Sequence, residues 1–503
     1  MVSGLGIPLF ISVFAVATCG LIYELIAGTV ASYLLGDSVT QFSTVIGVYL
    51  FAMGIGSYLT RYIRQNLLQF FVRTEILVGL VGGFSAAILY FSFQYVSNFR
   101  IVLYSLITLI GILVGVEIPL ILRIMKDRVE FKDLVSRVFA LDCVGALFAS
   151  IVFPLVLVPI LGLVRSSFLF GIINVALALW LLVIIRDEFP WRRFLQSGAI
   201  AALIALSTGF VYSEQLTSFA ETANYQDNVI YAKSSKVQRI VLTGSEHAVK
   251  LHLNGNLQFN SRDEYRYHEA LVHVGLATLD RPKRGLILGG GDGLALREVF
   301  KYPSVESVTL VDLDKVVTDL FAGQTLLTQL NSGSLTDPRV QIVNTDAFIW
   351  LRDAPPASFD FIIVDFPDPT NFSVGKLYTT NFYNALHRAL AVGGVAVVQA
   401  SSPIQARKSF WCVVSTLESV GFEVVPYHAY VPSFGEWGFV IASKHNWHPA
   451  TSYPAGLRFV EPDSVAAMLS FPADMSRVPA DINRLTNQAL VRYFDAEWQD
   501  VAF

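Results

Sequence analysis

Seven long apolar segments occupy the first 212 residues of the chain, and they restrict how this front half can fold. A helix needs about 20 consecutive apolar residues to cross the hydrocarbon core of a bilayer. Backbone groups in lipid must find partners within their own segment or in a closed barrel, so runs of this length predict spanning helices. The predicted spans are 6–34, 41–60, 72–95, 101–124, 139–163, 166–185 and 193–212.

Four acids lie within or at the ends of these segments. Glu75 and Asp142 are near segment ends, where we expect them at the membrane interface. Glu24 and Glu117 lie deeper, and acids in hydrocarbon are costly unless they have a partner or face a polar path. Two interpretations of the deeper pair stay open: a structural role, or the lining of a cation or substrate path.

The chain after residue 213 has the composition of a catalytic region. All eight histidines lie there, and acidic residues outnumber basic ones, whereas the front half is slightly basic. An acidic region disfavours nucleic acid, which requires a basic footprint, and suits a cationic small molecule. The cysteines follow no metal or redox spacing, so we expect no metal site. They are Cys19, Cys143 and Cys412.

A linker and a small antiparallel β-region are expected over residues 213–283. Asn254-Gly255 is a strong two-residue hairpin turn between two alternating segments. A helix should follow and run to about Leu279, with Asp263 or Ser261 capping its start.

Four acids follow short aliphatic runs between Leu286 and Pro369. They are Asp292 in the turn Gly-Gly-Gly-Asp-Gly (289–293), Asp312, Asp346, and Asp365 in Asp-Phe-Pro-Asp-Pro (365–369). In a doubly wound parallel sheet, such positions lie at the carboxyl ends of strands, where these folds bind ligands. Residues 284–444 are therefore predicted to form an α/β Rossmann-like domain that binds an adenosine-containing molecule.

The charges of these acids indicate which class of adenosine-containing molecule the site can bind. A carboxylate at Asp292 would repel a pyrophosphate, whereas Asp292 facing Asp365 would attract a cation. Asp365 and Asp368 form a carboxylate pair, in which one acid can hold an ammonium group while the other accepts a proton from an attacking amine.

Over residues 225–444 the chain resembles the spermidine synthases, or polyamine aminopropyltransferases. The similar motifs are Tyr225-Gln226, the run from Asn254 to Glu269, Gly289 to Gly293, Asp365 to Pro369, and Pro432 to Phe439. The apolar front half and the C-terminal extension, residues 445–503, resemble the membrane-bound multi-pass branch of that family. Helices are expected in this extension near 463–469 and 479–494.

The resemblance implies a class I methyltransferase-type fold and decarboxylated S-adenosylmethionine as co-substrate, with no prosthetic group. Putrescine is the default acceptor amine, and spermidine and methylthioadenosine are the products. The implied roles are as follows: Asp292 and Asp365 for the donor's ammonium, Asp312 for the ribose, Asp346 and Ala347 for the adenine, Gln226 and His268 for the donor's chain, Gly289 and Gly291 for close backbone approach, Asp365, Asp368 and Tyr267 for the acceptor amine, and Phe434 and Trp437 for its pocket.

Several residues depart from the family pattern. Asp312 replaces the usual glutamate, and Asp346-Ala347 replaces Asp-Gly. Lys376 stands where soluble members often carry an acid, and Phe434 replaces a tyrosine. The last two changes fall on the acceptor side, so the donor is better defined than the acceptor. The alternatives are an amine at the membrane surface as acceptor, methyl transfer from intact S-adenosylmethionine, and a non-catalytic polyamine sensor or carrier.

The expected partners are a small amine and a lipid bilayer, and the chain is compatible with a homo-oligomer. Basic residues cluster in alternate connections of residues 1–212. We expect the chain to lie in the cell (inner) membrane. With seven spans, the positive-inside rule places the catalytic half on the outer side of this membrane. The supply of an adenosyl-sulfonium donor favours the cytoplasm instead.

Overall fold

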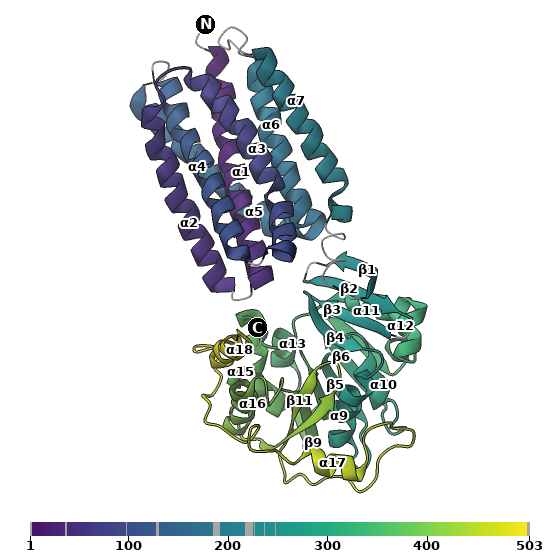
Figure 1. Cartoon of the computed structure of the whole chain (residues 1–503). Coiled ribbons are helices and arrows are strands. Elements are labelled where there is room, and N and C mark those ends of the chain that lie inside the picture. Colours follow the sequence, from purple (N-terminus) through teal and green to yellow (C-terminus); the bar gives the residue numbers. More distant parts are fainter. Residues whose placement is uncertain are drawn as a thin grey trace. The chain divides into compact units, whose positions relative to one another are not determined.

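The computed structural model describes residues 3–35, 38–96, 98–126, 130–184, 192–216, 225, 227–235, 237–246 and 248–499. The chain divides into two compact units, Met1–Gln226 and Asp227–Phe503 (Figure 1). Each unit is described separately.

The first unit is a helical bundle in which α1 contacts α2, α3, α4, α5 and α6. Its apolar side chains pack into the interior of the bundle. On α1, for example, Ile22, Ile26 and Val30 are fully buried. The helices are α1 (Ser3–Leu35), α2 (Ser38–Leu59), α3 (Leu67–Tyr95), α4 (Phe99–Met125), α5 (Phe131–Val152), α6 (Gly162–Ile184) and α7 (Arg192–Val211).

Six helical segments among the described residues are long and apolar enough to cross a membrane, not the expected seven. The predicted spans 139–163 and 166–185 fall in one continuous helical segment, Phe131–Ile184. A π-helix, Phe153–Leu161, joins α5 to α6 across Pro154 and Pro159, and Gly162 follows with φ +74°. The change of backbone geometry therefore occurs within helical structure, without the connecting loop that the sequence suggested.

The interfacial position expected for Glu75 is wrong. Glu75 on α3 and Glu117 on α4 are both buried and lie within hydrogen-bonding reach of each other. Apart from this mutual contact, no hydrogen-bond donor among the described residues reaches either carboxyl group. Glu24 on α1 is 8% exposed, so it also faces the bundle interior.

The second unit begins with a four-stranded antiparallel sheet in the order β1-β2-β3-β4. The expected hairpin joins β3 to β4, with Asn254 and Gly255 both at positive φ, as a two-residue turn of this kind requires. The strands are β1 (Asn228–Ser234), β2 (Arg239–Ser245), β3 (Ala248–Leu253) and β4 (Asn256–Asn260).

A seven-stranded sheet in the order β10-β11-β9-β8-β5-β6-β7 forms the centre of this unit. The five strands from β5 to β9 are parallel, and β10 and β11 are antiparallel additions. The chain runs outward from β5 through β6 to β7 and then returns to β8, so the topological switch point lies between β5 and β8. The strands are β5 (Arg284–Gly289), β6 (Ser307–Asp312), β7 (Val340–Asn344), β8 (Phe359–Asp365), β9 (Leu390–Gln399), β10 (Glu423–Val431) and β11 (Gly435–Ser443).

Helices cover both faces of this sheet, and alternate strand residues serve two separate cores. Ile287 packs with the core that contains α9, α10 and α11, whereas Leu286 and Leu288 pack with the core that contains α13, α15 and α16. This arrangement explains why β5 is apolar throughout. The helices are α9 (Glu264–Leu276), α10 (Leu294–Val299), α11 (Lys315–Gly323), α12 (Thr325–Leu330), α13 (Ala347–Asp353), α14 (Phe372–Gly375), α15 (Thr380–Ala389) and α16 (Arg407–Ser419).

The C-terminal extension contributes α17 (Pro462–Met468) and α18 (Ala489–Gln499). The helix expected over 479–494 starts later than predicted, because residues 479–488 form turns around the buried Asn483, and Gln488 has φ +44°. α17 packs on β10, and α18 packs on α16.

Candidate active site

The glycine turn after β5 passes between two of the predicted acids at the switch point. A Cβ atom on Gly289 would lie 2.1 Å from the Asp365 carbonyl oxygen, and one on Gly291 would lie 2.7 Å from Asp312 Cγ. The Gly291 amide also donates to Asp312 Oδ2 at 3.1 Å. Only glycine allows the turn to approach both strand ends this closely. The turn therefore brings the ends of β6 and β8 into one site, where open α/β sheets bind ligands.

Tyr267 on α9 reaches the end of β8, where its hydroxyl donates to Asp365 Oδ1 at 2.6 Å. The Tyr267 ring centroid lies 6.2 Å from that of Phe434, which in turn lies 5.2 Å from that of Trp437. The Trp437 indole donates to Gln399 Oε1 at 3.2 Å. The late aromatic segment, called the aromatic wall below, thus packs against Tyr267, the residue that bonds to Asp365.

Asp292 and Asp365 both lie close enough to His268 for its positive charge to lower their pKa values. Burial raises the pKa of Asp292 to about 6, although the nearby His268 opposes the rise. Burial also raises the pKa of Asp365, and His268 and the Tyr267 hydrogen bond oppose that shift. Burial alone would favour neutral His268, but the hydrogen bond and charge of Glu264, with Asp292 and Asp365, raise its pKa to about 9. A protonated imidazole therefore offsets the negative charge of these two acids near neutral pH.

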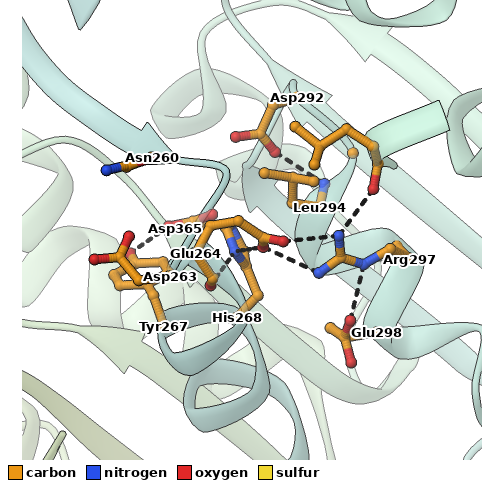
Figure 2. Close-up of polar contacts among 12 residues, drawn as sticks. Asn260, Asp263, Glu264, Tyr267, His268, Asp292, Leu294, Arg297, Glu298 and Asp365 are labelled. Atoms are coloured by element: carbon orange, nitrogen blue, oxygen red, sulfur yellow. Dashed lines mark hydrogen bonds and ion pairs between the residues drawn. The ribbon is translucent and has the colours of Figure 1, made fainter. Parts of the chain in front are cut away.

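Glu264 contacts both the His268 ring and the Arg297 guanidinium, as Figure 2 shows. Glu264 Oε2 lies 2.8 Å from His268 Nδ1, and both carboxylate oxygens accept from Arg297 at 3.0 Å. Arg297 Nε continues the network to Glu298 Oε1 at 2.9 Å. Burial favours neutral Glu264, but the bonds from His268 and Arg297 hold its pKa below the ordinary value. The network keeps a negative charge beside His268 and orients its ring.

Asp368 is the second member of the predicted carboxylate pair. Burial raises its pKa to about 7, so it can accept and release a proton near neutrality. Among the described residues, no hydrogen-bond partner reaches its Oδ1 atom. A buried acceptor without a partner is unusual in a folded protein and fits a group with a role in binding or proton transfer.

Asp312 and Asp346 lie at the ends of neighbouring strands. Asp312 Oδ1 accepts from the Asp314 amide at 2.8 Å, and burial raises the pKa of its carboxyl group to about 6. Asp346 caps α13 by accepting from the Phe348 amide at 2.9 Å, and Ala347 is the first residue of that helix. Lys376 Nζ lies 2.5 Å from Asp346 Oδ2. Lys376 therefore contacts the predicted adenine position, and its expected place on the acceptor side is wrong.

The structure brings most of the predicted site residues to one edge of the sheet, but Gln226 lies outside the described residues. Neither proposed cap of α9 is observed. Ser261 Oγ accepts instead from the Val249 amide at 2.9 Å. Asp263 makes no cap bond, and its carboxylate accepts from the Ser433 amide and hydroxyl at 2.7 and 2.8 Å. This contact ties the start of α9 to the aromatic wall.

Sequence reasoning missed Glu264, Arg297 and Gln399. Gln399 follows the apolar run of β9, so it obeys the same strand-end pattern as the predicted acids, and that pattern could have identified it. Glu264 belongs to the acidic motif, but its partner Arg297 could be found only from the fold. Among the described residues, no three His, Cys, Asp or Glu side chains are grouped so that they could hold a metal ion.

Comparison with known proteins adds independent evidence. Residues 264–452 match the family model described as the spermine/spermidine synthase domain. The polyamine aminopropyltransferase of Leptospira interrogans is 50% identical over 98% of this chain and 99% of its own. Polyamine aminopropyltransferase 2 of Ralstonia nicotianae is 52% identical over 98% of each chain. A spermidine synthase solved in complex with the transition-state analogue AdoDATO is 31% identical, with a TM-score of 0.46 over 49% of this chain and 86% of that one.

Proposed function

The chain belongs to the polyamine aminopropyltransferases and is an enzyme of aminopropyl transfer, and we propose that its donor is decarboxylated S-adenosylmethionine and its acceptor is putrescine. The observation that carries this proposal is the pair Asp292 and Asp365, whose carboxyl groups lie beside the glycine turn and share the charge of His268. Such a pair favours a donor that carries an ammonium group at the end of the three-carbon chain on its sulfonium.

In this proposal the acids at different strand ends bind different parts of the donor. Asp312 accepts from the ribose hydroxyls, and Asp346 with Ala347 meets the amino edge of the adenine. Asp292 and Asp365 hold the aminopropyl ammonium, and His268 lies beside the carbon chain of the same aminopropyl group. An intact methionine carboxylate would lie against these acids and be repelled, which supports the decarboxylated donor over methyl transfer from S-adenosylmethionine.

In the proposed reaction, the neutral nitrogen of the acceptor amine attacks the methylene carbon next to the sulfonium. A C–N bond forms, the C–S bond breaks, and its electron pair stays on the sulfur of methylthioadenosine. The proton lost by the amine passes to Asp365 or Asp368, and Tyr267 orients the first of these. The sulfonium is already an activated leaving group, so alignment supplies much of the catalysis.

Apolar side chains on the outside of the first unit support attachment to a lipid bilayer. Phe51 on α2 is 71% exposed and Phe194 on α7 is 72% exposed, and both belong to segments long enough to span. Many other large apolar side chains of this unit are exposed as well, and soluble proteins rarely expose so much apolar surface unless it contacts a membrane or a partner. We also propose that the catalytic unit lies on the cytoplasmic side, where the donor is made. A C-terminal tag labelled by a membrane-impermeant reagent only after the cells are opened would support this side, and labelling of intact cells would contradict it.

The substrate proposal is tested with the purified full chain and labelled decarboxylated donor against a panel of amines. Methylthioadenosine should appear only when an amine is present, with putrescine the best acceptor. Turnover with the carboxylated donor alone would indicate methyl transfer. Binding of amines without turnover would indicate a sensor or carrier. If a lipid-linked amine reacts faster than putrescine, that amine is the acceptor and the putrescine proposal is wrong.

A further inference from the structure

The loop of residues 371–378 follows the Asp-Phe-Pro-Asp-Pro motif directly. Asn371 starts α14 by accepting from the Val374 amide at 3.1 Å, and a 3-10 turn, Lys376–Tyr378, completes the loop. Nothing in the proposed reaction uses this loop, yet it lies between the carboxylate pair and α15.

Two side chains of the loop reach opposite parts of the site. The Lys376 ammonium bonds to Asp346 Oδ2 at 2.5 Å, at the predicted adenine position. The Tyr378 hydroxyl donates to the Pro367 carbonyl at 3.1 Å, in the backbone between Asp365 and Asp368. The position of this loop therefore bears on both ends of the site.

The C-terminal extension holds the loop through one buried side chain, Asn483. Its Nδ2 donates to the Gly375 carbonyl at 3.2 Å and to the Tyr378 carbonyl at 3.0 Å. Its Oδ1 accepts from the Leu490 amide at 3.3 Å. Asn483 is completely buried, so removal of its amide would leave both loop carbonyls without this donor.

The backbone of Asn483 is fixed from both sides. Its amide donates to Thr416 Oγ1 at 2.9 Å, and its carbonyl accepts from the Thr380 amide at 3.0 Å. A Cβ atom on Gly375 would lie 2.3 Å from Val491 Cγ2, so the loop also packs directly against α18. The extension is thus built into the catalytic unit at the point where the loop turns toward the site.

We propose that Asn483 is a positioning residue of the donor site, which acts by placing Lys376 on Asp346 and Tyr378 on the Pro367 carbonyl. Lys376 then fixes the rotation of the Asp346 carboxylate that meets the adenine. This inference rests on the proposed function of Asp346. It gives the C-terminal extension a role in donor binding.

The test compares Asn483→Ala with Lys376→Met and with the double variant, in the purified full chain. Each single change should raise the KM for the donor and the Kd for methylthioadenosine about tenfold, the effect of losing one or two hydrogen bonds, with a smaller change in kcat. The double variant should be little worse than either single one, because both act through the same carboxylate. Asn483→Asp, which keeps the size and loses the Nδ2 donor, should behave like Asn483→Ala.

Asn487→Ala is the matched control. Its amide bonds stay within the extension, to Ile482 and Arg484, so donor KM should change by less than about twofold. The proposal is overturned if a folded Asn483 variant keeps the wild-type constants, or if the effects of Asn483 and Lys376 add fully. Loss of folding in both Asn483 variants would also count against it, since a purely structural role would then suffice. Wild-type protein that binds methylthioadenosine without turnover would contradict the proposed function alone, because the binding comparison still tests Asn483.

Discussion

The hydroxyl of Tyr267 on α9 donates a 2.6 Å hydrogen bond to Oδ1 of Asp365 at the end of β8. Burial raises the pKa of Asp365, and this bond is one of the two contacts that oppose the rise. Tyr267→Phe should therefore raise the pKa of Asp365 and shift the acidic limb of the kcat/KM profile to higher pH. We expect kcat at pH 7 to fall about tenfold, a typical effect of weakening one acid–base group. Tyr265→Phe, in the same helix, should leave the profile unchanged.

The activity should rise between pH 6 and pH 8. The pKa of Asp368 is about 7 and that of Asp292 about 6, and both groups must be ionised to accept a proton or hold a cation. A group with pKa 7 goes from mostly protonated to mostly ionised over this interval, so kcat/KM should increase about tenfold. In Asp368→Asn the residual activity should lose the limb near pH 7. A wild-type profile that is flat from pH 6 to pH 8 would argue against these roles.

Glu264 should stabilise the fold most strongly between neutral pH and the depressed pKa at which its own carboxylate becomes protonated. The folded pKa of His268 is about 9, above the unfolded value near 6.5. The stabilisation is therefore complete below about pH 6.5 and is lost as the pH rises through 9. In Glu264→Gln, His268 should lose most of this effect, which is on the order of 3 kcal/mol.

Thermal unfolding of the full chain in detergent checks this prediction. The wild type should unfold at a higher temperature than Glu264→Gln at pH 6.5, and the difference should narrow toward pH 9.5. A difference that stays constant over this interval would show that Glu264 acts by packing and not through the charge of His268. Glu306→Gln, whose only ion pair is the surface contact with Lys283 among the described residues, is the control.

The strand-end acids were predictable because two local signals agree at them. An aliphatic run followed by an acid identifies the end of a buried parallel strand, and the order of such ends along the chain follows from doubly wound topology. Asp292, Asp312, Asp346 and Asp365 were all found in this way, and so could Gln399 have been. The hairpin at Asn254-Gly255 was predictable for a similar reason, since positive φ at both positions is local chemistry.

Contacts between distant segments were not predictable from these patterns. Asp263 looks like a helix cap, but its carboxylate bonds to Ser433, far along the chain, because the aromatic wall folds back over α9. Glu75 looks interfacial by its place in the sequence, but α4 brings Glu117 against it. The join of α5 to α6 through a π-helix also escaped prediction, because proline predicts an interruption and the helix continues with altered geometry.

The role of Asp365 in aminopropyl transfer is measured by the amine-dependent release of methylthioadenosine from decarboxylated S-adenosylmethionine by Asp365→Asn. Asp360→Asn is the matched control on the same strand, because Asp360 bonds to Arg284 at the opposite end of β8. If Asp365 holds the donor and accepts the proton, kcat should fall about a thousandfold in Asp365→Asn and stay near the wild-type value in Asp360→Asn. Turnover by Asp365→Asn within a few fold of the wild type would contradict this role of Asp365.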